Sequence, residues 1–358
     1  KTTTLQSIVF EAIHRYTPRE VNFYIIDAGT MAMMAFRDSK HVGGVVLLSE
    51  EDRVRNLFKL LTAQIQERKS RFMACGVGTY RAYLEAGKRD MPQIVLVIDN
   101  VAAFREYYEQ YDDTLQMLAR EGLSVGLSLL VTGTASSNLN YRTLSNFNCK
   151  VCFTCNDTSE YTAMVGARRM EPANCPGRAL VEQFALPTEG ETEQERRKNM
   201  EAELAQIAAL YDEHAKPIPV VPEVLNLADA MKDAPEKFRQ PYEMVVGMDY
   251  SSVEYVTLKL DELSTFVISG RPKSGKHTAV KNILRQIQAN VFIHLSEAII
   301  FDGPRRSLSA MKTLGCVKSY ITDTSEMKEA VDALWQEMSE RQDALFALEE
   351  DDERMELT

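Results

Sequence analysis

The stretch 270–278 has the spacing of a phosphate-binding loop. Its members are, in order, Gly270, Arg271, Pro272, Lys273, Ser274, Gly275, Lys276, His277 and Thr278. In the pattern G-x-x-x-x-G-K-[ST], the glycines let backbone N–H groups surround phosphates, the lysine adds positive charge, and the hydroxyl binds Mg²⁺. His277 stands where the hydroxyl is expected. The stretch therefore predicts a site that binds ATP and holds Mg²⁺ weakly or not at all.

The residues on either side have the pattern that such a loop requires. An apolar run, 265–269, precedes the loop and predicts a strand, and apolar residues at helical spacing follow it, namely Val280, Ile283, Leu284 and Ile287. A strand leading in and a helix leading out distinguish a phosphate-binding loop from a chance match. A glycine-rich turn without a ligand is the alternative, which this context disfavours.

A second copy of the loop is visible at the start of the chain. Lys1, Thr2 and Thr3 have the form of the end of such a loop, whose glycines would precede the first residue. Thr2 retains the hydroxyl that His277 lacks. We therefore expect the first site to bind metal and nucleotide together better than the second.

Internal repetition supports the second copy. When the two loop lysines are aligned, residues 23–28 fall on 298–303 without a gap, and Asp27 falls on Asp302. A later stretch, 55–68, resembles 328–341 after a shift of two residues. Repetition over so long a distance indicates tandem domains and not a short-period solenoid.

A carboxylate ends the most apolar run of the chain, 93–99, which is typical of a buried parallel strand. At the end of such a strand Asp99 would lie beside the phosphates and, with Thr2, bind Mg²⁺. Asn100 follows, and an amide can orient water but cannot accept its proton. The pair Asp99 and Asn100 therefore predicts a degenerate catalytic site with slow hydrolysis. Alternatively, Asp99 merely caps the next helix.

Composition limits the class of protein. The chain has 358 residues, of which 45% are hydrophobic, and a net charge of −11. A protein that grips nucleic acid relies on clustered Lys and Arg, so this charge argues against nucleic acid as a partner. No apolar run approaches the roughly 18 residues that span a bilayer. The six cysteines are unevenly spaced, which fits a reducing compartment better than a disulfide scaffold.

Helix and strand signals alternate, which indicates a parallel sheet covered on both faces. We expect helices at 4–16, 51–75, 101–121 and 189–213, and strands at 22–27, 44–48, 93–99, 128–132, 149–155 and 177–184. Three prolines between 217 and 222 suggest an extended linker. The predicted domains are 1–216 and 239–358, joined by the linker 217–238. Trp335 lies on a helical apolar stripe and is predicted to be in the core.

Three cysteines, Cys149, Cys152 and Cys155, are spaced like metal ligands. In the predicted strand 149–155, however, side chains alternate between faces, so Cys152 would point away from the other two. Tetrahedral metal sites need convergent ligands. We therefore expect no shared metal site there.

Together these motifs resemble the FtsK/SpoIIIE translocase ATPases, and in particular the membrane-anchored ATPases of type VII secretion called EssC or EccC. The runs 1–6, 16–27 and 41–45 carry the resemblance, which covers essentially the whole chain. It implies tandem RecA-like P-loop NTPase domains, each a mostly parallel sheet flanked by helices, of which the second is incomplete. It also implies ATP and Mg²⁺ as cofactors.

The chain departs from active members of that family at three places. Asn100 replaces a glutamate, His277 replaces a hydroxyl, and the stretch 131–134 lacks the glutamine of active translocases. These departures put hydrolysis in doubt and leave nucleotide binding plausible, so enzymatic activity stays open.

The resemblance also implies partners and a location. These are WXG100-type secreted proteins, other ATPase domains of the same chain, a hexameric ring, and a membrane reached through a segment outside this sequence, on its cytoplasmic face. Regulation of the motor or recruitment of substrates would then be the role of these domains. An FtsK-like DNA translocase and a purely structural pseudo-ATPase are the alternatives.

Overall fold

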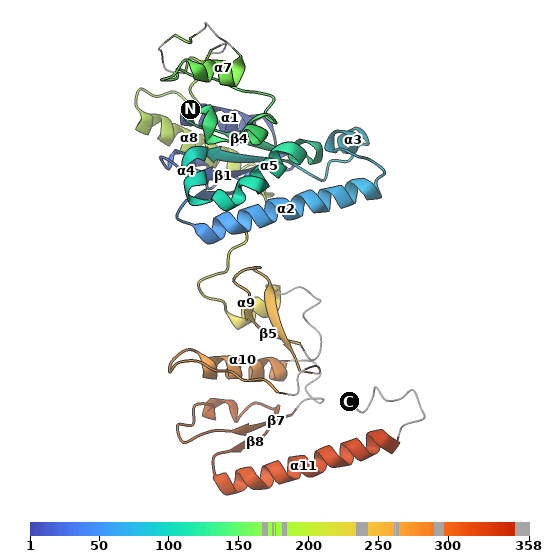
Figure 1. The fold of residues 1–358 in the computed structure, drawn as a ribbon. Coiled ribbons are helices and arrows are strands. Elements are labelled where there is room, and N and C mark those ends of the chain that lie inside the picture. The colour runs from blue at the N-terminus through green and yellow to red at the C-terminus, as the bar shows by residue number, and fades with distance from the viewer. Residues whose placement is uncertain are drawn as a thin grey trace. The chain divides into compact units, whose positions relative to one another are not determined.

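The computed structural model describes residues 1–358 with the exception of 167–170, 174, 176, 181–184, 234–242, 261, 263–264, 290–296 and 348–358. The chain divides into two compact units, Lys1–Val220 and Val221–Thr358, which are described separately (Figure 1). Among the described residues, no helix is both long enough and apolar enough to cross a membrane.

A four-stranded parallel sheet forms the centre of the first unit. Its order is β2 (Val42–Leu47), β1 (Val21–Asp27), β3 (Gln93–Asp99) and β4 (Leu127–Val131). The strands are continuous apolar runs because helices cover both faces. In the register of β1 and β3, Asp27 lies opposite Asp99 at the carboxyl edge.

Alternation along the strands sends side chains into two cores. Phe23, Ile25 and Val97 pack with α1 (Thr2–Arg15), the 3-10 turn η1 (Ala32–Phe36) and α8 (Glu193–Ala208). Residues of the opposite parity pack with the helices of the other face, which are α2 (Glu51–Ala74), α3 (Tyr80–Glu85), α4 (Val101–Tyr107) and α5 (Asp112–Glu121). The predicted fold class, a parallel α/β sheet flanked by helices, is confirmed.

The helix predicted over 101–121 is interrupted. It consists of α4, the 3-10 turn η2 (Glu109–Tyr111) and α5. Tyr108 leaves the helical conformation, with φ −135° and ψ 44°, and its buried hydroxyl donates to the carbonyl of Leu48. Arg105 pairs with Asp112, the first residue of α5. Tertiary packing of Tyr108 thus overrides helical periodicity.

The strands predicted at 149–155 and 177–184 do not form among the described residues, and 181–184 lies outside them. An isolated antiparallel bridge joins Phe153 to Ala179. The N–H of Cys155 donates to the Tyr161 hydroxyl at 2.9 Å, and not to a neighbouring strand. The remaining short elements of this unit are η3 (Gly122–Val125), η4 (Ser136–Asn138), α6 (Tyr141–Leu144) and α7 (Ser159–Val165).

An edge segment, residues 215–219, runs along the outer side of β2. Ala215 N–H donates to the Lys40 carbonyl at 2.7 Å, and Ile218 N–H donates to the Gly43 carbonyl at 3.1 Å. The segment therefore closes an exposed strand edge, which would otherwise present unpaired backbone groups. Part of the predicted linker is in this way bound to the first unit.

The described residues of the second unit form two small sheets. An antiparallel hairpin joins β5 (Glu243–Met248) to β6 (Tyr255–Lys259), and a parallel pair joins β7 (Ala298–Phe301) to β8 (Val317–Ile321). Its other elements are α9 (Leu227–Asp233), α10 (Lys276–Ala289), η7 (Ser309–Met311) and α11 (Thr324–Ala347). Leu284 of α10 and Ile300 of β7 pack together in a small core of this unit.

Two expectations for the second unit are wrong. The run 265–269 forms no strand, and Val267 is 90% exposed, because the described residues of this unit offer it no neighbouring strand. Trp335 is 70% exposed on α11 and does not lie in a core.

Candidate functional site

The carboxyl end of β3 and the start of α1 bring Thr2 and Asp99 together. The Thr2 hydroxyl donates to Asp99 Oδ2 at 2.8 Å, although the residues are 97 positions apart. Asp99 is only 3% exposed. A buried carboxylate needs compensating hydrogen bonds, and Thr2 supplies one of them. The two predicted metal ligands therefore meet in one place.

Thr132, which sequence reasoning did not assign to the site, binds the other carboxylate oxygen. The Thr132 hydroxyl donates to Asp99 Oδ1 at 2.6 Å, and the Thr132 hydroxyl oxygen in turn accepts the N–H of Asn100 at 2.9 Å. Thr132 follows β4 directly, and the register of β3 with β4 sets Val131 beside Ile98. A hydroxyl just after a strand that neighbours β3 was the signal that could have revealed it.

Lys1 and Thr3 differ in their relation to this site. Lys1 Nζ donates to the Gly133 carbonyl at 3.0 Å, just beyond Thr132. Thr3 is exposed. Of the three predicted loop residues, Lys1 and Thr2 thus contact the Asp99 neighbourhood, and Thr3 faces solvent.

Asn100 caps a helix. It has a left-handed backbone, with φ 66°, and its side chain accepts the Ala103 N–H at 3.4 Å at the start of α4. Its amide nitrogen lies 3.4 Å from the Ala28 carbonyl. The capping role considered for Asp99 therefore belongs to Asn100, whose side chain is occupied by backbone groups.

The loop 270–276 of the second unit is closed on itself. Lys276 Nζ donates to the carbonyls of Gly270 and Arg271 at 2.7 and 2.8 Å, and α10 begins at Lys276. Gly275 has φ 90°, a conformation that favours glycine, and a Cβ on Gly270 would lie 2.5 Å from Ser274 Oγ, which would have to rotate away. The other predicted residues of the loop, Arg271, Pro272, Lys273, Ser274, His277 and Thr278, are exposed.

Asp302 directly follows β7, lies near this loop and is buried. Burial opposes its ionisation, but the Leu308 N–H and the Tyr320 hydroxyl lower the pKa of this carboxyl by hydrogen bonding, and the charge of His277 acts in the same direction. Asp302 is therefore an ionised carboxylate that holds its own loop.

The two loops fit Mg²⁺ differently. Carboxylate and hydroxyl oxygens are hard ligands of the kind Mg²⁺ takes, and the first unit places Thr2 and Asp99 together. In the second unit His277 offers an imidazole, which suits softer transition metals. Among the residues that the structure describes, no cluster of three or more His, Cys, Asp or Glu side chains could hold a metal ion.

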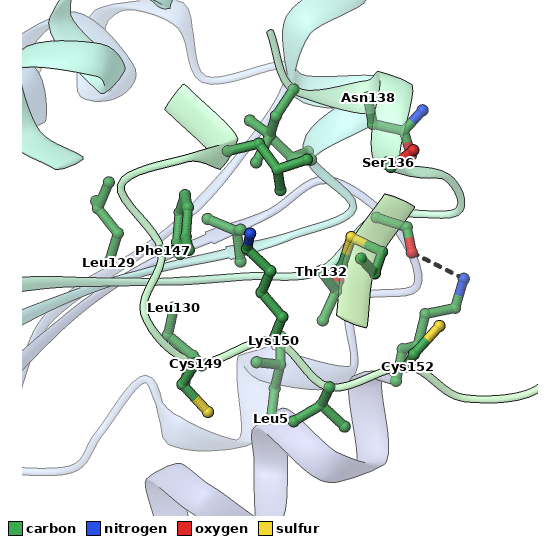
Figure 2. Close-up of a pocket in the computed structure, with 18 of the residues that line it drawn as sticks. Leu5, Leu129, Leu130, Thr132, Ser136, Asn138, Phe147, Cys149, Lys150 and Cys152 are labelled. Atoms are coloured by element: carbon green, nitrogen blue, oxygen red, sulfur yellow. Dashed lines mark hydrogen bonds between the residues drawn. The ribbon is translucent and has the colours of Figure 1, made fainter. Parts of the chain in front are cut away.

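A pocket of about 660 Å³ lies beside the Asp99 site. Figure 2 shows Leu129, Leu130 and Thr132 of the β4 region lining it together with Cys149 and Cys152. Lys1 and Gly133 also border it. The pocket is therefore continuous with the predicted phosphate site.

Comparison with known proteins identifies relatives of this chain. The FtsK/SpoIIIE family model matches residues 1–216. The ESX secretion system protein EccC of Geobacillus thermodenitrificans (strain NG80-2) is 26% identical over 319 residues, which cover 86% of this chain and 21% of that protein. The type VII secretion system protein EssC of Staphylococcus aureus (strain MRSA252) is 26% identical over 315 residues, covering 83% and 21%. The chain thus spans about a fifth of these relatives.

Solved structures show the same fold. EssC (ATPases 2 and 3) from Geobacillus thermodenitrificans has a TM-score of 0.84 at 24% identity, covering 96% of this chain and 67% of that one. Thermomonospora curvata EccC (ATPases 2 and 3), in complex with a signal sequence peptide, has a TM-score of 0.64 at 22% identity, covering 95% and 63%. The resemblance inferred from the sequence motifs is confirmed.

Proposed function

The chain belongs to the FtsK/SpoIIIE family, and from this premise we propose that it comprises two nucleotide-binding ATPase domains of a type VII secretion motor. The first, 1–216, binds ATP with Mg²⁺, and the second, 239–358, binds ATP with little need of the metal; 217–238 links them. The observation that carries the proposal is the 2.8 Å hydrogen bond between Thr2 and Asp99, because it unites the two groups that share Mg²⁺ in P-loop NTPases.

Slow or absent hydrolysis is part of the proposal. A general base must reach the attacking water, and Asn100 can neither accept a proton nor turn freely, since its amide is bound to Ala28 and Ala103. Nucleotide binding would then regulate the motor instead of powering it.

In the second unit, ATP replaces contacts within the loop. Lys276 leaves the Gly270 and Arg271 carbonyls and places its charge on the outer phosphates, while the backbone between Gly270 and His277 supplies N–H donors. The lysine contributes a charge-assisted bond of about 1.5–3 kcal/mol.

The partners proposed for this chain follow from its relatives. Thermomonospora curvata EccC was solved with a signal sequence peptide, and we extend peptide recognition to this chain, with WXG100-type secreted proteins as substrates. Other ATPase domains of the same polypeptide, assembly into a hexamer, and attachment to the cytoplasmic face of the membrane through another segment complete the proposal.

Calorimetric titration with ATP, with and without Mg²⁺, tests the nucleotide assignment. We compare the wild type with Lys1→Ala and Lys276→Ala, and use Lys281→Ala on α10 as the matched control. Lys276→Ala is expected to weaken one site by about tenfold or more and to leave the fold intact, since the hydrogen bonds of Lys276 in the structure lie within its own loop.

Chelation of Mg²⁺ should change the affinity of the second site by no more than about threefold, which is about 0.7 kcal/mol. A large loss on chelation at that site would contradict metal independence. Absence of ATP binding at both sites would favour the purely structural pseudo-ATPase.

A DNA translocase of the FtsK type is the alternative function. The net charge of −11 disfavours it, because duplex binding depends on clustered positive charge. A gel shift with duplex DNA at increasing salt separates the two: tight, salt-sensitive binding would overturn the secretion assignment.

A further inference from the structure

Cys152 and Cys155 form a close pair of thiols. Their sulfur atoms are 3.6 Å apart, although strand geometry would have sent them to opposite faces. The Cys155 thiol donates to the Phe153 carbonyl at 3.3 Å, which leaves its sulfur free to accept from the Cys152 thiol. The other cysteines of this segment, Cys149 and Cys175, are exposed.

The backbone holds both cysteines in place. The Cys152 carbonyl accepts the Leu180 N–H at 2.9 Å, and the Cys155 N–H donates to the buried hydroxyl of Tyr161, also at 2.9 Å. A disulfide places its sulfurs about 2.05 Å apart. The two sulfurs would therefore have to approach each other by about 1.5 Å to form a disulfide.

We propose that Cys152 and Cys155 form a reversible intramolecular disulfide, exchanged with a glutathione-type disulfide, in the wall of the pocket beside β4. Neither cysteine takes part in the proposed binding of nucleotide. The pair lines the same pocket as Thr132 and Lys150 (Figure 2). The wall of that pocket would thus respond to the thiol–disulfide balance of its surroundings.

The chemistry balances in two exchange steps. The thiolate of Cys155 attacks glutathione disulfide, which forms a mixed disulfide and releases one glutathione thiolate. Cys152 then loses its proton and attacks the Cys155 sulfur, and a second glutathione leaves with that proton. Two protein thiols are oxidised by two electrons, and one glutathione disulfide is reduced to two thiols.

Burial assigns the order of these steps. Cys152 is 5% exposed, and burial together with the Cys155 thiol raises the pKa of Cys152 to about 12. Because only the thiolate attacks, Cys152 is a poor first nucleophile. Cys155 is half-buried and reaches the oxidant first. Attack by the buried Cys152 is therefore the slower step, and its rate should rise with pH because a larger fraction of Cys152 is then thiolate.

The full chain, equilibrated in reduced and oxidised glutathione at several ratios, is then alkylated and digested with trypsin. Cleavage after Lys150 separates Cys149 from the peptide that holds Cys152 and Cys155. In excess disulfide we expect the peptide that holds Cys152 and Cys155 to escape alkylation and to weigh two hydrogen atoms less than its reduced form, with no glutathione attached.

Variants make the outcome specific. Cys149→Ser should lose the same pair as the wild type, whereas Cys152→Ser should stop at the mixed disulfide on Cys155, and Cys155→Ser should form no internal disulfide. Retention of all six thiols in excess oxidant would overturn the proposal. A disulfide that links two chains or includes Cys149 or Cys175 would do the same.

Discussion

The carboxylate of Asp302 repeats the role of Asp27. Asp27 Oδ2 accepts the Met33 N–H at 2.9 Å, and Asp302 Oδ2 accepts the Leu308 N–H at 2.8 Å, in each case six residues further along the chain. Asp27 is the last residue of β1 and Asp302 directly follows β7; each strand belongs to a parallel pair, and each aspartate holds the loop that follows. The internal repeat seen in the sequence thus extends to the hydrogen bonds of the two aspartates. Both carboxylates stabilise the loop that follows their strand.

Metal dependence should therefore come from Thr2 and Asp99. Thr2→Val removes a hard oxygen ligand and Asp99→Asn removes the negative charge of the other, so each is expected to abolish the gain in ATP affinity that Mg²⁺ gives the first unit, a loss of about tenfold or more. Fluorescent ATP titrations with Mg²⁺ or with chelator measure this, in a Lys276→Ala background that silences the second loop.

Thr3→Val is the matched control, because Thr3 is the neighbouring threonine and is exposed. It should keep the Mg²⁺ effect. Equal losses in Thr2→Val and Thr3→Val, or none in either, would disprove the ligand assignment.

The edge segment depends on a glycine. A Cβ on Gly43 would meet the Tyr24 ring and lie 2.5 Å from the Lys216 carbonyl, which accepts the Tyr24 hydroxyl at 2.8 Å. Gly43→Ala is expected to lower the free energy of unfolding by about 1–3 kcal/mol, because overpacking forces the segment away from β2. Urea unfolding measures it.

Gly78→Ala serves as its control, since a Cβ there would meet nothing within 4 Å. The change should stay within about 0.5 kcal/mol. Should Gly43→Ala be as mild as this control, residues 215–219 would not be tightly docked on the sheet.

The central part of the fold could be predicted because its signals are local and agree with one another. The apolar run 93–99 is a strand with the predicted bounds, since burial on both faces requires continuous apolar residues. Asp99 and Thr2 meet because a parallel strand ends, and the loop helix begins, at the same edge of the sheet. The loop motif and the aspartate at the end of the strand were therefore sufficient to predict that these two side chains meet.

Other features depend on contacts that no local pattern encodes. The break at Tyr108 follows from its hydroxyl reaching Leu48, and the Cys152–Cys155 contact follows from backbone bonds to Leu180 and Tyr161. Periodicity predicts which face of an element is apolar, but not whether a partner covers it, and the exposed Trp335 is such a case.

Stability should fall in mild acid because of His41. Its ring is fully buried, Nε2 lies 2.7 Å from the Tyr16 carbonyl, and Nδ1 has no partner. Burial lowers the pKa of His41 below its usual value of 6.5. Above pH 6.5 the His41 imidazole is neutral in both the folded and the unfolded protein. Below pH 6.5 the imidazole is protonated in the unfolded chain but stays neutral in the folded protein. The free energy of unfolding therefore declines as the pH falls, by at most about 1.4 kcal/mol per pH unit.

Urea unfolding between pH 7.5 and 5 measures this decline. In His41→Gln, whose amide can still donate to Tyr16, the His41 contribution should vanish, and the difference between the two proteins isolates it from carboxylates common to both. Identical pH profiles for wild type and variant would show that His41 does not titrate in this range.

A base introduced at position 100 should separate the effect of this residue on hydrolysis from its role as a helix cap. A glutamate can accept the proton of water, and general-base catalysis contributes about a hundredfold or more, so Asn100→Glu is expected to raise phosphate release by at least about tenfold in a Lys276→Ala background. It should also cost about 1–2 kcal/mol of stability, because asparagine suits both the left-handed backbone and the cap on Ala103.

Asn100→Gln is the matched control: it bears the same structural cost without a base, so its hydrolysis should stay at the wild-type level. Equal rates in the two variants, with ATP still bound, would mean that the missing base is not what limits hydrolysis.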